Sequence, residues 1–276
     1  MSVDMATINR NVLIGALLVP PAAPISFKGG RVLGLRLPEI EARYPPDAAV
    51  FRRPIGYSRG ALDKRYPKRR KKKKKMEFED YAWTVIEVDD SRAAEPTIAA
   101  LVDLSTGHYR FYLNEQIRRS KPVPAGEISH GLMSPPLAHV NSHLLRMLEK
   151  GLTLTRRQQR FAIAIQRWYS SIDRSVPIDA VIDCCSSLDS LFNVQQELRL
   201  RLAMAVYSYV RADKRKARSL VYGLYGRRNE FVHGQKVPEV TDAERREVTQ
   251  LTARILRQCI LAGSLPRIPP DALFAP

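Results

Sequence analysis

The second half of the chain carries apolar residues at the spacing of an α-helix. In the first set, which consists of Phe161, Ile165, Trp168 and Ile172, successive apolar residues lie three or four positions apart. Just ahead, Thr155 and Gln158 have the spacing of a capping box, in which two side chains satisfy free backbone groups at a helix start. The pattern predicts an amphipathic helix that begins near Thr155.

Four more helices are predicted by the same criterion. Pro177 suits the first turn of the second helix, Thr241 and Glu244 form another capping box, and Gly263 is placed to end the last helix. The apolar positions are Ile178, Val181, Ile182, Cys185, Leu188 and Phe192; Leu198, Leu202, Ala205, Val206 and Tyr209; Leu220, Leu224 and Phe231; and Val248, Leu251, Ile255 and Cys259. Five amphipathic helices with short connections predict an all-α bundle over residues 151–265, followed by a tail at 266–276.

The first half has shorter patterns of β type. Residues 81–88 are rich in β-branched and aromatic side chains, which favours a strand. Residues 97–104 and 108–113 are two similar runs, and the stretch between them ends in Gly107. We expect these two runs to form a hairpin.

The remaining N-terminal segments give weaker signals. Residues 12–19 are apolar but too few to span a bilayer, so a buried strand or short helix is expected there. A helical stretch over residues 137–148 leads into Gly151. We therefore expect an α+β chain with an irregular segment at 1–63, a basic linker or loop at 64–75, a small β-containing domain at 76–150, and then the bundle.

Positive charge is concentrated in one segment. The 276 residues have a formal net charge of +17, which favours a polyanionic partner; residues 64–75 hold ten of the basic side chains, and without them the charge would be +7. Such a run is expected to be exposed, as a solvated spacer, as a clamp for RNA phosphates, or as a contact with an anionic membrane surface. The RNA clamp would consist of Lys68, Arg69, Arg70, Lys71, Lys72, Lys73, Lys74 and Lys75.

Cysteines and histidines argue against a metal centre. Cys184, Cys185 and Cys259 are odd in number and lack a C-x-x-C pair, so neither a disulfide framework nor a zinc site is expected, and a reducing cytoplasmic setting fits best. His139 and His143 have the spacing of metal ligands but no acidic or cysteine partner near them in sequence. We expect no metal and no cofactor.

One helix end gathers groups that can cleave RNA. Arg228, Asn229 and His233 lie within one and a half turns, and Gly234 should stop the helix directly after them. A fixed cation, a hydrogen-bonding amide and an imidazole can move a proton and stabilise a phosphorane without a metal. The alternative is a charged helix end that frays.

The spacing of this stretch also poses a geometric problem. On an ideal helix, Arg228 and His233 point about 140° apart, so one regular helix cannot direct both at one phosphate. Either the last turn is distorted or a second copy of the chain completes the site.

Asp189 interrupts the apolar stripe of its own helix. It falls within about 50° of the centre of that stripe, whereas Asp183 falls on the solvent side. A carboxylate that faces the bundle must be paired, because burying it alone costs several kcal/mol, and Arg228 is the expected partner. The alternative is a stripe edge at which Asp189 reaches water. The tyrosines at 207, 209, 222 and 225 are expected in the core or at its rim.

Three segments resemble one known family. Residues 228–233 match the R-x4-6-H motif of the HEPN superfamily (higher eukaryotes and prokaryotes nucleotide-binding), and residues 225–234 are similar to the Y-x-x-R-x-x-x-V-H-G ending of its Apea-like branch. Residues 187–192 resemble the A-L-E-A-L-F helix of that branch, which places Asp189 on the acidic position, and residues 197–203 resemble its E-L-x-x-R-L-A segment. The resemblance covers residues 155–262.

The resemblance implies a dimeric helical bundle and metal-independent cleavage of RNA, as in toxin–antitoxin, phage-defence and RNA-processing systems. The 2′-hydroxyl would attack the adjacent phosphate and leave a 2′,3′-cyclic phosphate and a 5′-hydroxyl. His233 would move the proton, Arg228 would stabilise the phosphorane charge, and Asn229 and Asp189 would orient them. Arg227 is expected to contact RNA. Gln235 stands where toxins silenced by a nucleotidyltransferase have Tyr, so that mode of silencing is not expected.

Two functions follow as hypotheses. The first is a cytoplasmic, homodimeric endoribonuclease that binds RNA and no membrane. The second is a non-catalytic RNA-binding or scaffolding protein, in which Arg228 pairs with Asp189 and truncating either to alanine destabilises the bundle by about 3–5 kcal/mol.

Overall fold

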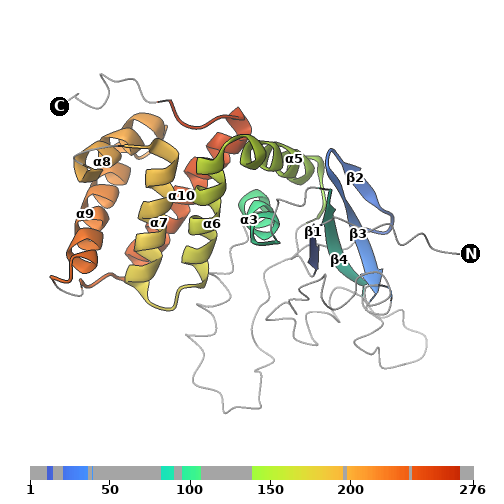
Figure 1. Ribbon diagram of the computed structural model, residues 1–276, viewed down its shortest axis with the longest axis horizontal. Helices are drawn as coiled ribbons and strands as arrows, with labels where there is room; N and C mark the ends of the chain where they lie inside the picture. Colours follow the sequence, from blue (N-terminus) through green and yellow to red (C-terminus); the bar gives the residue numbers. More distant parts are fainter. Residues whose placement is uncertain are drawn as a thin grey trace, which may run out of the picture. The chain divides into compact units, whose positions relative to one another are not determined.

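The computed structural model describes residues 11–14, 21–36, 39, 82–89, 95–106, 139–194, 198–235 and 238–267 (Figure 1). The chain divides into two compact units, Met1–Glu149 and Lys150–Pro276, and the division lies beside the boundary expected at residues 150 and 151. The described part of the first unit holds a small antiparallel sheet with helices, whereas that of the second is helical. The α+β class is therefore confirmed.

The sheet of the first unit has the strand order β1–β4–β3–β2, and every neighbouring pair is antiparallel. Its strands are β1 (Asn11–Ile14), β2 (Ile25–Phe27), β3 (Gly30–Arg36) and β4 (Ala82–Val88). The strand predicted at residues 81–88 is confirmed as β4. β1 overlaps the apolar run at residues 12–19, for which a strand or short helix was expected. The expectation that the rest of residues 1–63 is irregular was wrong for β2 and β3. Short strands between prolines leave too little periodicity to be detected from sequence.

The expectation of a hairpin at residues 97–113 was also wrong for the first half of that stretch. That stretch is the helix α3 (Glu95–Thr106), and its side chains from Thr97 to Leu104 are all buried. A continuous apolar run fits a buried strand and a buried helix equally well, and here the helix formers Ala99, Ala100 and Leu101 favour the helix. Residues 108–113 lie outside the described residues.

The next helix, α5 (Ser142–Arg157), is longer than expected. It begins where the side chain of Asn141 accepts a hydrogen bond of 2.9 Å from the backbone of Leu144, and it runs through Gly151. The hydroxyl of Thr155 donates to the carbonyl of Gly151 within the helix, so the capping box expected with Gln158 is absent. Instead, α6 starts after Gln158, which makes no side-chain cap.

The predicted bundle is confirmed in the second unit, where Figure 1 shows α6 and α7 side by side and α8 and α9 beyond them. The apolar stripe of α6 is fully buried, Pro177 is the first residue of α7, and α10 has both bonds of the Thr241–Glu244 capping box and ends at Gly263 in the left-handed conformation. The helices are α6 (Gln159–Asp173), α7 (Pro177–Phe192), α8 (Leu198–Tyr209), α9 (Lys214–Val232) and α10 (Asp242–Ala262). None of the helices in the described ranges is long and apolar enough to cross a membrane.

Candidate functional site

The end of α9 has the geometry predicted from Gly234. Gly234 adopts a left-handed φ of +66°, and its backbone N–H donates to Phe231, while that of Gln235 donates to Glu230 over 2.9 Å. These two bonds form a Schellman motif, which satisfies the last carbonyls of a helix. The helix therefore ends cleanly at Val232, and His233 caps it with an exposed side chain.

Arg228 lies on the inner side of α9, where it is partly buried. Its NH1 group donates a hydrogen bond of 2.9 Å to Oδ1 of Asn229, and its Cζ atom lies 5.3 Å from the centre of the Tyr225 ring. A guanidinium at that distance from an aromatic ring is attracted by the ring's electron-rich face. Arg228 is thus held in place by its own helix.

Asp189, in the last turn of α7, meets the same cluster. The hydroxyl of Tyr225 donates a hydrogen bond of 3.3 Å to its Oδ2 atom, while its Oδ1 atom is buried and has no hydrogen-bond partner among the described residues. Burial raises the pKa of Asp189 to about 6, although the Tyr225 hydrogen bond and the charge of Arg228 act in the opposite direction. Burial and the neighbouring carboxylate raise the pKa of Tyr225 to about 12.

The expected ion pair between Asp189 and Arg228 does not form. Within the described part of the chain, Asp189 is paired with the Tyr225 hydroxyl, and Arg228 acts on it only through its electric field. The alternative, in which Asp189 reaches water at a stripe edge, fails for Oδ1, because that atom is buried. Folding therefore removes part of the water around the Asp189 carboxylate, and no cation of the described residues contacts that carboxylate in exchange.

Asp183 was placed on the solvent side of α7, and this expectation was wrong. Its side chain is only 4% exposed, and its two oxygens accept hydrogen bonds from Arg174 at 2.7 Å and Arg167 at 3.3 Å. Both arginines come from α6 and the residue that follows it, and the ideal-helix projection of α7 ignores that covering segment. Asp183 therefore joins α6 to α7.

The structure brings some of the predicted site residues together and separates others. Arg228, Asn229 and Asp189 belong to one cluster between α9 and α7, whereas His233 points from the exposed helix end and makes no side-chain hydrogen bond with the described residues. The last turn is regular, so distortion does not bring Arg228 and His233 together.

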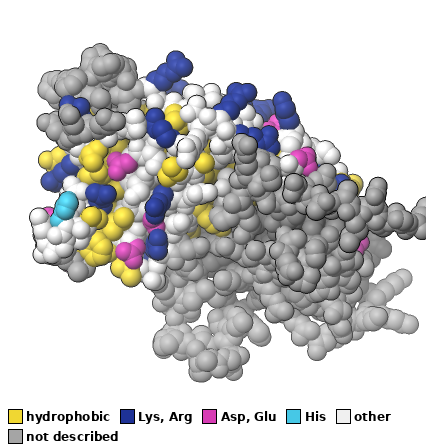
Figure 2. All heavy atoms as spheres, in the orientation of Figure 1, with side chains coloured by type: hydrophobic (Ala, Val, Ile, Leu, Met, Phe, Trp, Pro, Cys, Tyr) yellow, Lys and Arg dark blue, Asp and Glu magenta, His cyan; other side chains and the backbone are white. Residues whose placement is uncertain are grey.

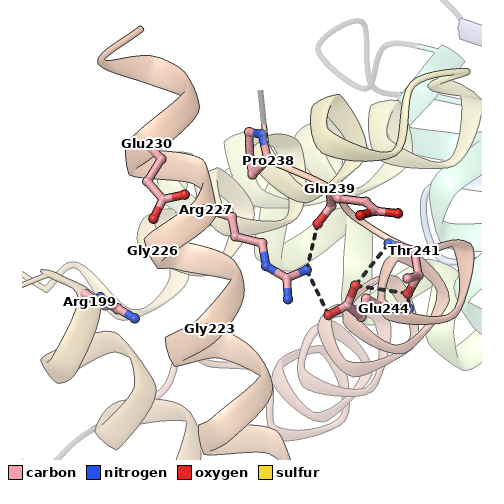
Figure 3. Close-up of a pocket in the computed structure, with 9 residues that line it drawn as sticks. All are labelled: Arg199, Gly223, Gly226, Arg227, Glu230, Pro238, Glu239, Thr241 and Glu244. Atoms are coloured by element: carbon pink, nitrogen blue, oxygen red, sulfur yellow. Dashed lines mark hydrogen bonds and ion pairs between the residues drawn. The ribbon is translucent and has the colours of Figure 1, made fainter. Parts of the chain in front are cut away.

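Arg227 is engaged within the bundle. Its NH1 group lies 2.8 Å from Oε1 of Glu244 and donates to the carbonyl of Glu239, so it ties α9 to the start of α10 (Figure 3). This guanidinium lowers the pKa of Glu244 to about 2. Arg227 also lines a pocket on the outer side of α9, together with Arg199, Gly223, Gly226, Glu230, Pro238, Glu239, Thr241 and Glu244.

Sequence reasoning missed this pocket, and one signal could have revealed it. Gly223 and Gly226 stand three residues apart inside a helix, where each costs stability relative to alanine and calls for a reason. The predicted RNA contacts at Lys68 to Lys75 lie outside the described residues. No group of three histidine, cysteine or acidic side chains within the described ranges is placed to hold a metal.

Comparisons of the chain with protein-family models, with curated proteins and with solved structures found no match.

Proposed function

We propose that the chain is a metal-independent endoribonuclease of the HEPN type that acts in the cytoplasm as a toxin or antiviral-defence effector. The observation that carries the proposal is the end of α9, where Arg228 and Asn229 are hydrogen-bonded to each other and His233 is exposed one turn further along. These three groups supply a fixed positive charge, an amide and an imidazole within the last two turns of one helix.

In the proposed reaction, the ribose 2′-oxygen bonds to phosphorus and the bond between phosphorus and the 5′-oxygen breaks. His233 takes the proton from the 2′-hydroxyl and returns it to the departing 5′-oxygen, which leaves as a hydroxyl, and Arg228 stabilises the negative charge on the phosphorane. Asn229 holds the Arg228 guanidinium at 2.9 Å, and Asp189 shapes the field around it. The products are a 2′,3′-cyclic phosphate and a 5′-hydroxyl.

A second copy of the chain would complete this site. Arg228 faces α7 and His233 faces away from it, so the proposal pairs Arg228 of one protomer with the histidine of another. Exposed apolar side chains gather on α8 and α9, and Figure 2 shows apolar surface among basic side chains there. They are Leu198, Leu200 and Val232, each between 36% and 51% exposed, which is surface suited to a protein contact.

The bound substrate would also need a non-specific phosphate contact. The net charge of +17 favours a nucleic acid over a neutral ligand, and the proposal assigns that contact to Lys68 to Lys75. The contact supplies affinity without selecting a sequence.

One observation favours a non-catalytic RNA-binding or scaffolding role instead. Arg228 already has partners within its own chain, since it bonds to Asn229 and lies over Tyr225. In a purely structural role, that arrangement would fasten α9 to α7, and His233 would only end the helix.

The two functions differ in a cleavage assay. Single-stranded RNA of mixed sequence is incubated in EDTA with the wild type, with His233→Ala, and with His143→Ala, a control histidine exposed on α5. The proposal predicts fragments with cyclic-phosphate ends from the wild type and the control, and none from His233→Ala. A folded, dimeric wild type that leaves the RNA intact would support the scaffolding role.

A further inference from the structure

The outer side of α9 has a pocket that the proposed reaction does not use. It has a volume of about 710 Å³ and lies against the glycines at positions 223 and 226 (Figure 3). Arg199, from α8, stands on one side, and Arg227 reaches to Glu239 and Glu244 on the other. The pocket is lined by two arginines and three glutamates, of which Arg227 and Glu244 are paired with each other, and by the helix backbone at the two glycines.

Arg199 is held firmly on its side of the pocket. Its Nε atom donates a hydrogen bond of 3.0 Å to the carbonyl of Tyr222, and its Cζ atom lies 4.0 Å from the centre of the Tyr222 ring. These contacts use one edge and one face of the guanidinium. No other hydrogen bond or ion pair occupies its terminal nitrogens within the described residues, so they are available to an anion.

Gly226 makes room for this arrangement. A Cβ atom at that position would lie 2.8 Å from Cζ of Arg199 and 2.9 Å from its NH2 atom, closer than carbon and nitrogen atoms pack. Alanine at position 226 would therefore displace the Arg199 guanidinium from this position.

Gly223 has no such reason to be glycine. A Cβ atom there would meet nothing within 4 Å, and the residue lies in the middle of α9, where alanine would make a more stable helix. A glycine that no neighbour in the fold requires suggests that a ligand approaches the backbone closely.

The position of the pocket along α9 links it to the helix end. On a helix of 3.6 residues per turn, Gly226 and His233 lie within about 20° of the same line and about 10 Å apart along the axis. A dinucleotide can span that distance. A chain with one phosphodiester at His233 would therefore pass over the pocket.

We propose that this pocket binds one nucleotide of single-stranded RNA next to the scissile phosphate, with a phosphate on Arg199 and the ribose against the backbone at Gly223. A nucleotide suits this lining, because it carries an anion for Arg199 together with hydroxyl and amino donors for the carboxylate of Glu239. The choice of RNA rests on the proposed function; the existence of a binding site at Arg199 and Gly223 does not.

The test measures binding of a labelled single-stranded RNA in EDTA, with all variants in a His233→Ala background so that the probe stays intact. Arg199→Gln should weaken binding roughly tenfold and reduce the slope of log affinity against log salt by about 0.7, the value for one lost phosphate contact on a single strand. Arg157→Gln, which removes an exposed charge from α5, is the matched control and should change affinity by less than about twofold.

Two glycine variants test the position of the Arg199 guanidinium and the access to the backbone without changing the charge of the pocket. Gly223→Gln should weaken binding several-fold, leave the salt slope unchanged and not lower the melting temperature. Gly226→Ala should weaken binding nearly as much as Arg199→Gln although the charge is kept. Binding by the Arg199 and Gly223 variants that equals that of the Arg157 control would overturn the inference. This readout does not depend on cleavage, so a wild type that binds through Arg199 but does not cut RNA would refute only the nuclease.

Discussion

The hydroxyl of Tyr225 donates a hydrogen bond of 3.3 Å to Oδ2 of Asp189, and this contact joins α9 to α7 beneath the predicted catalytic residues. A phenol takes the place that the sequence suggested for Arg228. Because a neutral donor compensates a buried charge less than a cation does, Asp189 keeps a raised pKa, and the stability of this junction depends on pH.

Asp189→Asn should change that pH dependence. The pKa of Asp189 rises from 3.8 to about 6 on folding, so the folded state binds the proton more tightly than the unfolded state does. Protonation of Asp189 therefore stabilises the fold at low pH, and this stabilisation is lost as the pH rises from about 4 to above 6. Asparagine cannot ionise. Relative to the wild type, the variant should therefore gain roughly 2 kcal/mol in free energy of unfolding between about pH 4 and pH 7.

Chemical denaturation at a series of pH values measures this difference. Asp179→Asn removes the same charge from the first turn of α7, at the other end of the helix from Asp189, and is the control. A gap between wild type and Asp189→Asn that stays constant with pH would contradict the desolvation of Asp189.

Arg228→Ala should destabilise the protein less than a broken buried ion pair would. Arg228 has no ion pair with Asp189, so its removal costs the contact with Tyr225, the bond to Asn229 and a favourable field. We expect a loss of about 1–2 kcal/mol in free energy of unfolding at neutral pH. A loss of 3–5 kcal/mol would instead indicate that Arg228 holds the bundle together, as the scaffolding hypothesis required.

Asp183→Ala should be the more damaging acidic substitution in α7. It would leave Arg167 and Arg174 without the carboxylate that both contact, at a position that is only 4% exposed. Because the two arginines are about half exposed, we expect a loss of roughly 2–3 kcal/mol, below the full cost of a buried unpaired charge. Equal effects of Asp183→Ala and Asp179→Ala on the urea midpoint would show that the α6–α7 contact is not the cause.

Two threonines with the same sequence signature should respond differently to alanine. Thr241→Ala removes the hydroxyl that accepts from the backbone of Glu244 and should cost about 1 kcal/mol. Thr155 bonds inside α5, where alanine is the better helix former, so Thr155→Ala should be neutral or slightly stabilising. Thermal unfolding of both variants tests the structural difference between them.

The two threonines also show which features of the fold can be predicted from the sequence. A capping box is a local sequence pattern, and it caps a helix only where the preceding helix has already ended. The residues around Thr155 do not show whether that helix has ended. The bundle was predictable because stripes such as Phe161, Ile165 and Trp168 record burial directly in their spacing. The end of α9 was predictable because Gly234 allows the left-handed conformation that stops it.

The candidate site was predictable only in part. Arg228, Asn229 and His233 follow from one helix, but the partners of Asp189 and Asp183 depend on which neighbouring helix covers each of them. No single-helix projection contains that information. The pocket at Arg199 brings α8, α9 and the start of α10 together, so its lining could not be listed from spacing.

The most direct test of the account mixes two inactive variants. If the site takes Arg228 from one protomer and His233 from the other, co-expressed Arg228→Ala and His233→Ala chains form heterodimers with one intact site. RNA cleavage in EDTA should then return to about a quarter of the wild-type rate, because half the dimers are mixed and half their sites are complete. Each variant alone should be inactive. Inactivity of the mixed dimers beside an active wild type would contradict a site shared between two copies.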